Sequence, residues 1–203
     1  MSTCAYDDLC SANRTTMWIK HAYHGASVVF AGYVRHTTID HNTIRHSGYT
    51  GISLGWGWGR VVSFAADNHV TNNRVESVMQ DLNDGGCVYT LGPQPDSTVS
   101  GNFCAMDAAP VVGCFYHDNG SRYFTTTNNV ADTSPAPCVY LQGCCGAPAL
   151  DIHVSDLWCR NTAPVRNGCA PQNCTIDANT TYIVTTKTWP AAAQAIVDNA
   201  GAH

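Results

Sequence analysis

The chain has 203 residues, a net charge of −5 and only 12% charged side chains, so it lacks the basic surface that nucleic acids or anionic membranes attract. No apolar run approaches the length of a membrane-spanning helix. The length suits a single repetitive domain, which we expect to be a monomer with neither a nucleic-acid nor a membrane partner.

Residues 1–32 are predicted to form an irregular N-terminal segment or a partial turn of the repeat. They lack the basic and then apolar pattern of a signal peptide. Because the repeats follow directly, we expect the sequence to be the C-terminal part of a longer secreted or extracellular protein, truncated at its N-terminus.

Residues 33–186 carry a repeated pattern, apolar-x-x-Asn-x-apolar. Short apolar segments alternate with polar residues at a period of two, which indicates strands, and turn-forming residues separate them. The repeat length, about 26 to 31 residues, is too short for propeller blades, and no leucine-rich consensus is present. The pattern predicts an all-β fold, a right-handed parallel β-helix.

The repeated asparagines should stack on one another in successive turns, about 4.8 Å apart. Their amides can bond to each other and to the turn backbone, which satisfies buried polar groups. We therefore predict a purely structural ladder at an inward bend, with a serine in the fifth and weakest copy. Its members would be Asn42, Asn73, Asn102, Asn128 and Ser155.

A glycine-rich segment at residues 48–59 interrupts the repeats. Trp56 and Trp58 are separated by one glycine, and a narrow solenoid cannot bury both indoles. Exposed indoles stack on the apolar faces of sugars, so a sugar platform is the favoured interpretation. The alternative is a loop folded over the next turn. His46 precedes this segment and is a further candidate for substrate binding.

A second interruption spans residues 80–95, where Asp84 is followed by two glycines that permit a positive φ. Asp-Gly-Gly turns are common, so this motif alone is weak. Asp81 is a further ionisable candidate, and Gln94 is a candidate for substrate binding.

Three copies of the pattern Cys-apolar-Tyr lie at residues 87–89, 114–116 and 138–140. If the central apolar residues face the core, strict alternation turns the tyrosines outward. It also turns the cysteines outward, unless they sit at a bend or stack as small apolar residues. The row of Tyr89, Tyr116 and Tyr140 fits a sugar-stacking surface and fits packing beneath a loop equally well.

Asp118 has the parity of Tyr116 and should also face outward. It follows Asp84 by one turn on the same side of the repeat, which predicts a carboxylate separation of about 5–10 Å, as in glycosidases. His117 has inward parity, which suits a core histidine. We retain His117 and Tyr116 as candidates for substrate binding.

Eleven cysteines are many for a cytosolic chain of this length and indicate an oxidising compartment. Their odd number leaves at least one thiol free or intermolecular. No Cys-x-x-Cys pair supports a zinc site, so we expect neither a metal nor a cofactor. The cysteines that cluster in the loop-rich last third should form disulfides; they are Cys144, Cys145, Cys159, Cys169 and Cys174.

The last segment, residues 187–203, predicts one short helix. Pro190 suits its first turn and Gly201 its C-terminal cap. We expect Ile196 and the alanines to cover the open end of the solenoid, because unpaired strand edges need blocking.

Three of these segments resemble a known family. Residues 48–58 resemble Gly-Tyr-Ser-Gly-Ile-Ser-x-Gly-Trp-Gly-Trp. Residues 83–95 resemble Ser-Asp-Gly-Gly-x-Ile-Tyr-Thr-Leu-Gly-x-Gln-Pro, and residues 189–201 resemble Trp-Pro-x-Glu-Ala-x-x-Ile-x-x-Ala-Gly. The family comprises right-handed parallel β-helix proteins with PbH1 repeats and a pectin lyase-like fold, many of them secreted and carbohydrate-active.

The resemblance covers about residues 33–201 and implies a module similar to glycoside hydrolases. One departure matters, because relatives carry Tyr-x-Asp-Glu-Gly-Ser where residues 116–121 have Asn119 in place of the Glu. An amide neither donates a proton as an acid nor attacks as a carboxylate.

The leading hypothesis is an enzyme that cleaves glycosidic bonds in a polysaccharide or oligosaccharide. Asp84 and Asp118 would be its carboxylate pair and Asp81 would support them. The residues that hold sugar rings would be Trp56, Trp58 and Tyr89. The alternative is a catalytically inactive carbohydrate-binding or adhesin-like fragment, which Asn119 favours. A polysaccharide lyase is disfavoured, because the repeats contain no lysine base and no dense acidic cluster for calcium.

Overall fold

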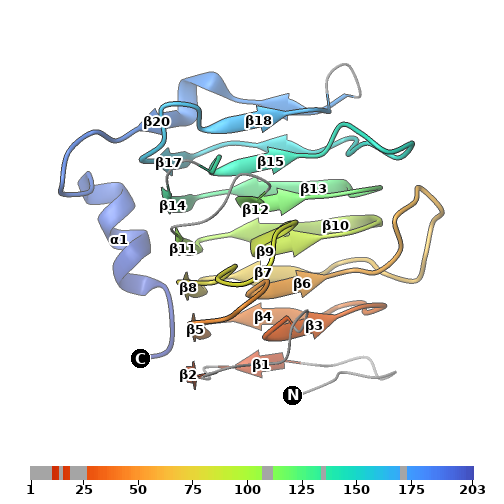
Figure 1. Ribbon diagram of the computed structural model, residues 1–203, viewed down its shortest axis with the longest axis horizontal. Coiled ribbons are helices and arrows are strands. Elements are labelled where there is room, and N and C mark those ends of the chain that lie inside the picture. Colours follow the sequence, from red (N-terminus) through yellow and green to blue (C-terminus); the bar gives the residue numbers. More distant parts are fainter. Residues whose placement is uncertain (1–10, 14–15, 19–26, 107–111, 134–135, 170–172) are drawn as a thin grey trace.

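The computed structural model describes residues 11–13, 16–18, 27–106, 112–133, 136–169 and 173–203. Their strands form a parallel β-solenoid with three sheets, which we name A, B and C, and a short C-terminal helix lies beside it (Figure 1). Each sheet stacks equivalent strands of successive turns, so every pairing of named strands is parallel. This confirms the predicted fold class.

The strands follow the order A, B, C along the chain. Sheet A contains β1 (Ser11–Asn13), β4 (Thr38–Asp40), β7 (His69–Thr71), β10 (Pro93–Ser100), β13 (Arg122–Thr127), β16 (His153–Val154) and β19 (Thr175–Ile176). Sheet B contains β2 (Thr16–Trp18), β5 (Thr43–Arg45), β8 (Arg74–Glu76), β11 (Phe103–Met106), β14 (Asn129–Thr133), β17 (Leu157–Cys159) and β20 (Thr181–Ile183).

Sheet C contains β3 (Val29–Ala31), β6 (Ile52–Leu54), β9 (Gly85–Thr90), β12 (Val112–His117), β15 (Val139–Leu141) and β18 (Val165–Asn167). The remaining elements are a 3₁₀ helix, η1 (Ala178–Thr180), and the helix α1 (Ala191–Asn199). Strands β1, β2 and β3 fall within residues 1–32, so the described part of that segment already belongs to the solenoid.

The core is the interior of the solenoid, built from one inward row per sheet. Val88, Phe115 and Val139 pair across sheet C and are fully buried, as their parity predicted. Sheet B contributes Ile44, Val75 and Cys104 from the same register position in successive turns. Stacking apolar side chains at each level removes them from water, which is the main force that holds a solenoid together.

The asparagine ladder is present, with one correction. Asn42, Asn73, Asn102 and Asn129 stack in order, and from Asn73 onward each side-chain oxygen accepts a hydrogen bond from the backbone N–H of the asparagine in the preceding turn. Asn129 therefore replaces the predicted Asn128, which turns the chain with a φ of 54°. Leu157 pairs with Asn129 in the next turn, so Ser155 is not a ladder residue.

Two disulfides cross the interior, Cys87–Cys104 and Cys138–Cys159. Cys87, Cys114 and Cys138 are fully buried, so the outward orientation given by strict alternation is wrong. The pairing of β9 with β12 continues on both sides of Cys87 but omits it, and this irregularity lets the chain turn two consecutive side chains inward. Cys114 is a free thiol among the described residues.

The other described disulfides, Cys144–Cys145 and Cys169–Cys174, lie in the last third of the chain, where disulfides were predicted. Several disulfides agree with an extracellular protein. Within the described residues, no helix is long and apolar enough to cross a membrane.

Helix α1 does not cover the open end of the solenoid. Its residues Ala193 and Val197 pack against Phe103 and Val130, which belong to the outward row of sheet B. The helix therefore runs along the side of the molecule (Figure 1). The prediction placed it at the end because unpaired strand edges need cover, but the apolar stripe on sheet B offers it more area to bury.

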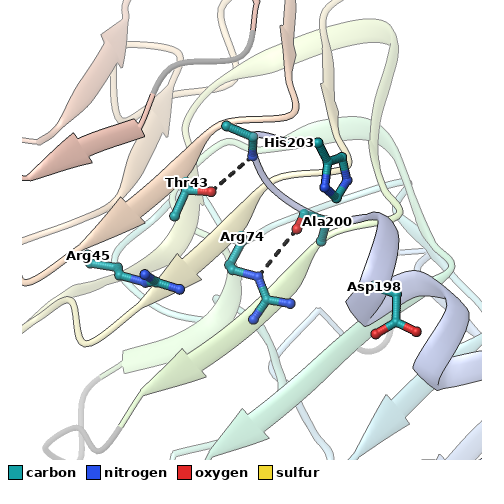
Figure 2. A pocket seen from close by; sticks show the side chains of 7 residues that line it. Thr43, Arg45, Arg74, Asp198, Ala200 and His203 are labelled. Atoms are coloured by element: carbon teal, nitrogen blue, oxygen red, sulfur yellow. Dashed lines mark hydrogen bonds between the residues drawn. The ribbon is translucent and has the colours of Figure 1, made fainter.

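Arg74 fixes the end of this helix. Its guanidinium donates to the carbonyl oxygens of Val197 and Ala200, as a basic group at a helix C-terminus should. A cavity of about 390 Å³ lies here between the chain end and sheet B (Figure 2). Arg45 and Arg74, which line it, both form ion pairs with Glu76, so one carboxylate serves both guanidinium groups.

Candidate active site

The outer face of sheet C carries a single register row that crosses all six strands. Its members are Phe30, Ser53, Tyr89, Tyr116, Tyr140 and Arg166. The three tyrosines form a cluster separate from the interior core, so their predicted outward direction is correct.

These tyrosines are nevertheless buried. Tyr116 has no exposed surface, and Tyr89 and Tyr140 are each 5% exposed. The Tyr116 ring stacks on Tyr140 at 4.4 Å and meets Tyr89 edge-on at 5.3 Å. Rings packed on each other leave little face for a sugar. Of the two interpretations of this row, the burial therefore favours packing on the sheet surface over a sugar-stacking surface.

The tyrosine hydroxyls converge on two carboxylates. Asp84 lies at the turn before β9, where its φ of 68° is one that aspartate tolerates better than most residues. It is exposed, and its carbonyl oxygen accepts a hydrogen bond from Tyr49 at 2.8 Å. Gly85 is required next to it, since a Cβ there would lie 2.2 Å from the Thr50 hydroxyl.

Asp118 follows the end of β12 and is only 4% exposed. Its Oδ2 accepts a hydrogen bond from Tyr89, and its Oδ1 accepts one from Tyr116 at 3.3 Å. The same Tyr116 hydroxyl lies 3.1 Å from Oδ1 of Asp84. Because both oxygens bond to one hydroxyl, they are at most about 6.4 Å apart, toward the short end of the range in glycosidases, roughly 5–9.5 Å.

The two carboxyl groups are in unlike environments. Burial raises the pKa of Asp118, and the nearby charge of Asp84 raises it further. Burial also raises the pKa of the Tyr89 and Tyr116 hydroxyls, and the charge of Asp118 adds to that shift. Both phenols therefore stay protonated and act as donors, while a buried acid sits beside an exposed carboxylate.

Gln142 completes this network and was not predicted. Its Nε2 donates to the Tyr116 hydroxyl at 2.9 Å. Gln142 lies two residues after Tyr140, just as Asp118 lies two residues after Tyr116. The repeat register therefore contained the signal, although glutamine is not itself a residue type that suggests acid–base chemistry.

The tryptophan loop borders Asp118. A Cβ on Gly120 would lie 2.0 Å from the carbonyl oxygen of Gly59, so this loop runs directly against the turn after Asp118. Trp56 and Trp58 are 46% and 52% exposed, with ring centroids 4.7 Å apart. The connection between β6 and β7 projects from the side of the solenoid opposite α1 (Figure 1).

Two candidates for substrate binding are structural residues. Gln94 is fully buried, and its Nε2 donates to the carbonyl oxygens of Leu54 and Leu91. His117 is 1% exposed, and its ring nitrogens bond to the hydroxyls of Thr90 and Thr126. These bonds and their burial give both residues a structural role rather than the predicted contact with a substrate.

Asp81 and His46 are both exposed. The Asp81 carboxylate lies over Gly48, where a Cβ would be 2.4 Å from its Oδ2, and its N–H donates to the Gly48 carbonyl. His46 turns the chain after β5 with a φ of 57°. The sulfur atoms of Cys87, Cys104 and Cys114 lie within 4.8 Å of each other, but the disulfide between the first two removes them as metal ligands.

Comparison with known proteins gives a coarse assignment. No family model and no curated protein matches the chain. A solved structure named as a glycoside hydrolase is similar to it, with a TM-score of 0.57 and 25% sequence identity. The match covers 88% of this chain and 25% of that one, so the chain spans about a quarter of the neighbour. This likeness agrees with the parallel β-solenoid described above.

Proposed function

We propose that this protein hydrolyses glycosidic bonds in a polysaccharide or oligosaccharide, with Asp84 and Asp118 as its carboxylate pair. The observation that carries the proposal is the Tyr116 hydroxyl, which bonds to both carboxyl groups while one is exposed and the other is buried. Two carboxyl groups in unlike environments at this separation are what glycoside hydrolysis requires. We further propose that the protein works outside the cell, as its disulfides suggest, and as a monomer.

The short separation favours a retaining mechanism. In its first step, Asp118 protonates the leaving glycosidic oxygen while the Asp84 carboxylate attacks the anomeric carbon. The bond to the leaving group breaks and a glycosyl ester of Asp84 forms. In the second step, water attacks the same carbon, gives its proton to Asp118 and releases Asp84 as a carboxylate.

Trp56 and Trp58 supply the apolar contact for a sugar. Their exposed indoles lie on the loop that borders the Asp118 turn, so a sugar stacked on them would sit at the edge of the carboxylate pair. Phe30, which meets Trp56 edge-on with ring centroids 5.7 Å apart, extends this apolar surface. Asp81 and His46 are exposed and remain candidates for polar contacts at its rim.

The test uses the folded chain on a panel of plant and algal polysaccharides and aryl glycosides, with release of reducing ends as the readout. Asp84→Asn should reduce turnover by about 10²–10⁴-fold. Asp96→Asn is the matched control, because Asp96 is also exposed and has a φ of 61°, close to the 68° of Asp84. Equal turnover of the two variants would reject the assignment of Asp84.

A second candidate is a carbohydrate-binding protein without catalysis. Asn119 favours it, because the family that the sequence resembles is expected to carry a glutamate there, and an amide cannot act as an acid. Binding to immobilised polysaccharide that is lost in Trp56→Ala/Trp58→Ala, combined with no turnover by the wild-type chain on any substrate, would establish this second function in place of hydrolysis.

A further inference from the structure

The Tyr116 hydroxyl is the node of a hydrogen-bonded chain. It accepts a hydrogen bond from the Gln142 amide and has a single proton of its own with which to donate one. Two carboxylate oxygens compete for that proton, Oδ1 of Asp84 at 3.1 Å and Oδ1 of Asp118 at 3.3 Å. One donor therefore faces two acceptors, and a proton on either carboxyl group lets both of them bond to the Tyr116 hydroxyl at the same time.

We propose that Asp84 and Asp118 share one proton through the Tyr116 hydroxyl, and that Gln142 is the positioning residue that directs this hydroxyl toward them. The catalytic meaning of this shared proton rests on the proposed function, but the proton itself does not.

Two arrangements of the proton satisfy every group. When Asp118 is protonated, its Oδ1–H donates to the Tyr116 oxygen, and the Tyr116 proton goes to ionised Asp84. When Asp84 is protonated, both bonds reverse and the Tyr116 proton goes to ionised Asp118. In each arrangement the Tyr116 oxygen makes no more than three hydrogen bonds, which is its capacity. No water molecule is needed to move the proton between the two carboxyl groups.

Gln142 is held so that its amide cannot turn over. Its Oε1 accepts from the Tyr140 hydroxyl at 3.2 Å, from Gly143 N at 2.9 Å and from Cys144 N at 3.3 Å. These donors require the oxygen on that side, which leaves the NH₂ group facing Tyr116. The disulfide between the adjacent residues Cys144 and Cys145 directly follows the two N–H groups of Gly143 and Cys144.

Tyrosine hydroxyls and an arginine surround the pair. Tyr89 donates to Asp118, Tyr49 donates to the Asp84 backbone, and Tyr140 donates to Gln142. Arg166 provides a positive charge, with its guanidinium 4.5 Å from the centroid of the Tyr140 ring. His117 points the other way and bonds to threonines in the core.

The experiment is a carbon-13 NMR titration of the aspartate carboxyl groups in the folded chain, without substrate. The pair should titrate in two steps at least about one pH unit apart, and the carboxyl shifts of Asp84 and Asp118 should both move in both steps. Tyr116→Phe removes the bridge, so each carboxyl should then respond mainly to one step.

Gln142→Glu tests the direction of the hydroxyl. It keeps the acceptor that anchors the side chain but replaces the NH₂ donor with a second acceptor, which draws the Tyr116 proton away from the pair. The shared response should be lost. Gln80→Glu adds the same charge on an exposed residue next to Asp81 and should leave the shared response in place. Circular dichroism and thermal unfolding of each variant report whether it is folded.

Independent titration of the two carboxyls in the wild-type chain would overturn the shared proton. An unchanged shared response in folded Gln142→Glu would overturn the role of Gln142. A shared proton in a chain that hydrolyses no glycan would leave this inference standing and reject the proposed enzyme, so the two failures are distinguishable.

Discussion

His117 and Asp118 are neighbours at the end of β12, yet they belong to opposite faces of the solenoid wall. Each is almost completely buried, and burial shifts the pKa of each toward its neutral form, downward for His117 and upward for Asp118. The difference lies in where their hydrogen bonds lead. The bonds of His117 end at two threonines in the core, whereas those of Asp118 lead through Tyr116 to the exposed Asp84.

The comparison shows that burial of an ionisable group does not by itself identify a functional site. His117 has the larger pKa shift, but nothing outside the core can reach it. Asp118 belongs to a chain of bonds that ends at solvent, and this connection makes it a candidate for proton transfer.

The largest effect should come from acid titration of His117. Burial lowers its pKa from the ordinary value of 6.5 to about 3. Between these two pH values the imidazole is protonated in the unfolded chain and neutral in the folded chain. Stability contributed by the neutral ring is complete above pH 6.5 and is lost as the pH falls toward 3. The loss should reach about 4–5 kcal/mol, at 1.36 kcal/mol per pH unit.

Denaturant unfolding between pH 3 and pH 7 measures this loss. His117→Gln stays neutral throughout, so its stability should depend less steeply on pH than that of the wild-type chain. Parallel curves for the two proteins would show that His117 does not titrate on unfolding, and the contrast between the two faces would fail.

The next largest effect concerns the asparagine ladder. Asn73 accepts from the backbone N–H and the side-chain amide of Asn42, and it donates to Asn102 and to two carbonyls. Asn73→Ala leaves several buried groups without partners and should lower the free energy of unfolding by about 3–4 kcal/mol. Asn83→Ala, at an exposed position, should change it by less than about 0.5 kcal/mol. Similar losses in the two variants would contradict a structural role for the ladder.

A stabilising change should be possible on the same inward face. Ala131 lies in register between Cys104 and Cys159. Each of these cysteines forms a disulfide across the core with the cysteine of the sheet C segment that precedes it, Cys87 or Cys138. In the middle turn Cys114 has no such disulfide partner among the described residues. Ala131→Cys should therefore let the introduced thiol form a disulfide with Cys114 and raise the free energy of unfolding by about 3 kcal/mol.

Peptide mapping of the unreduced chain detects the new bond, and denaturant unfolding measures the gain. Ala131→Cys combined with Cys114→Ala is the control, since it adds the thiol without the partner. A gain of equal size in the control would show that the cystine is not its source.

The fold could be predicted because it repeats. The spacing of Asn42, Asn73 and Asn102 implies stacked turns, and the parity of Val88 and Phe115 implies their direction. The prediction slipped by one residue at Asn129, because the equivalent of Val99 in that turn is Thr126, and a polar residue gives no apolar signal to align on. The site of α1 could not be predicted, since sequence periodicity does not reveal which outward residues will be covered.

The nearness of the carboxylate pair was predictable from the order of the turns. Asp84 and Asp118 were expected to be close because they lie on the same side of neighbouring turns, and one hydroxyl indeed bonds to both. Asp84 precedes β9 and Asp118 follows β12, so the register does not align them, and it is the Tyr116 side chain that joins them. The sequence left the burial of Tyr116 open, because it depends on how neighbouring rings pack on the sheet. Glutamine has no acid–base chemistry that would mark Gln142, although its offset from Tyr140 equals that of Asp118 from Tyr116.

The smallest effect should have the opposite sign and belongs to Asp118. Its folded pKa is raised above the ordinary value of 3.8, so the folded chain binds a proton more tightly than the unfolded chain does. Stability should therefore fall as the pH rises from 3.8 through the folded pKa, and should recover on acidification.

Asp118→Asn cannot titrate, so the difference in unfolding free energy between it and the wild-type chain should grow along that interval. Because His117 loses stability over the same acid range, the test compares Asp118→Asn with His117→Gln, and the two difference curves should slope in opposite directions. Curves of equal slope would mean that the two faces respond to protons alike and that the outward network holds no raised acid.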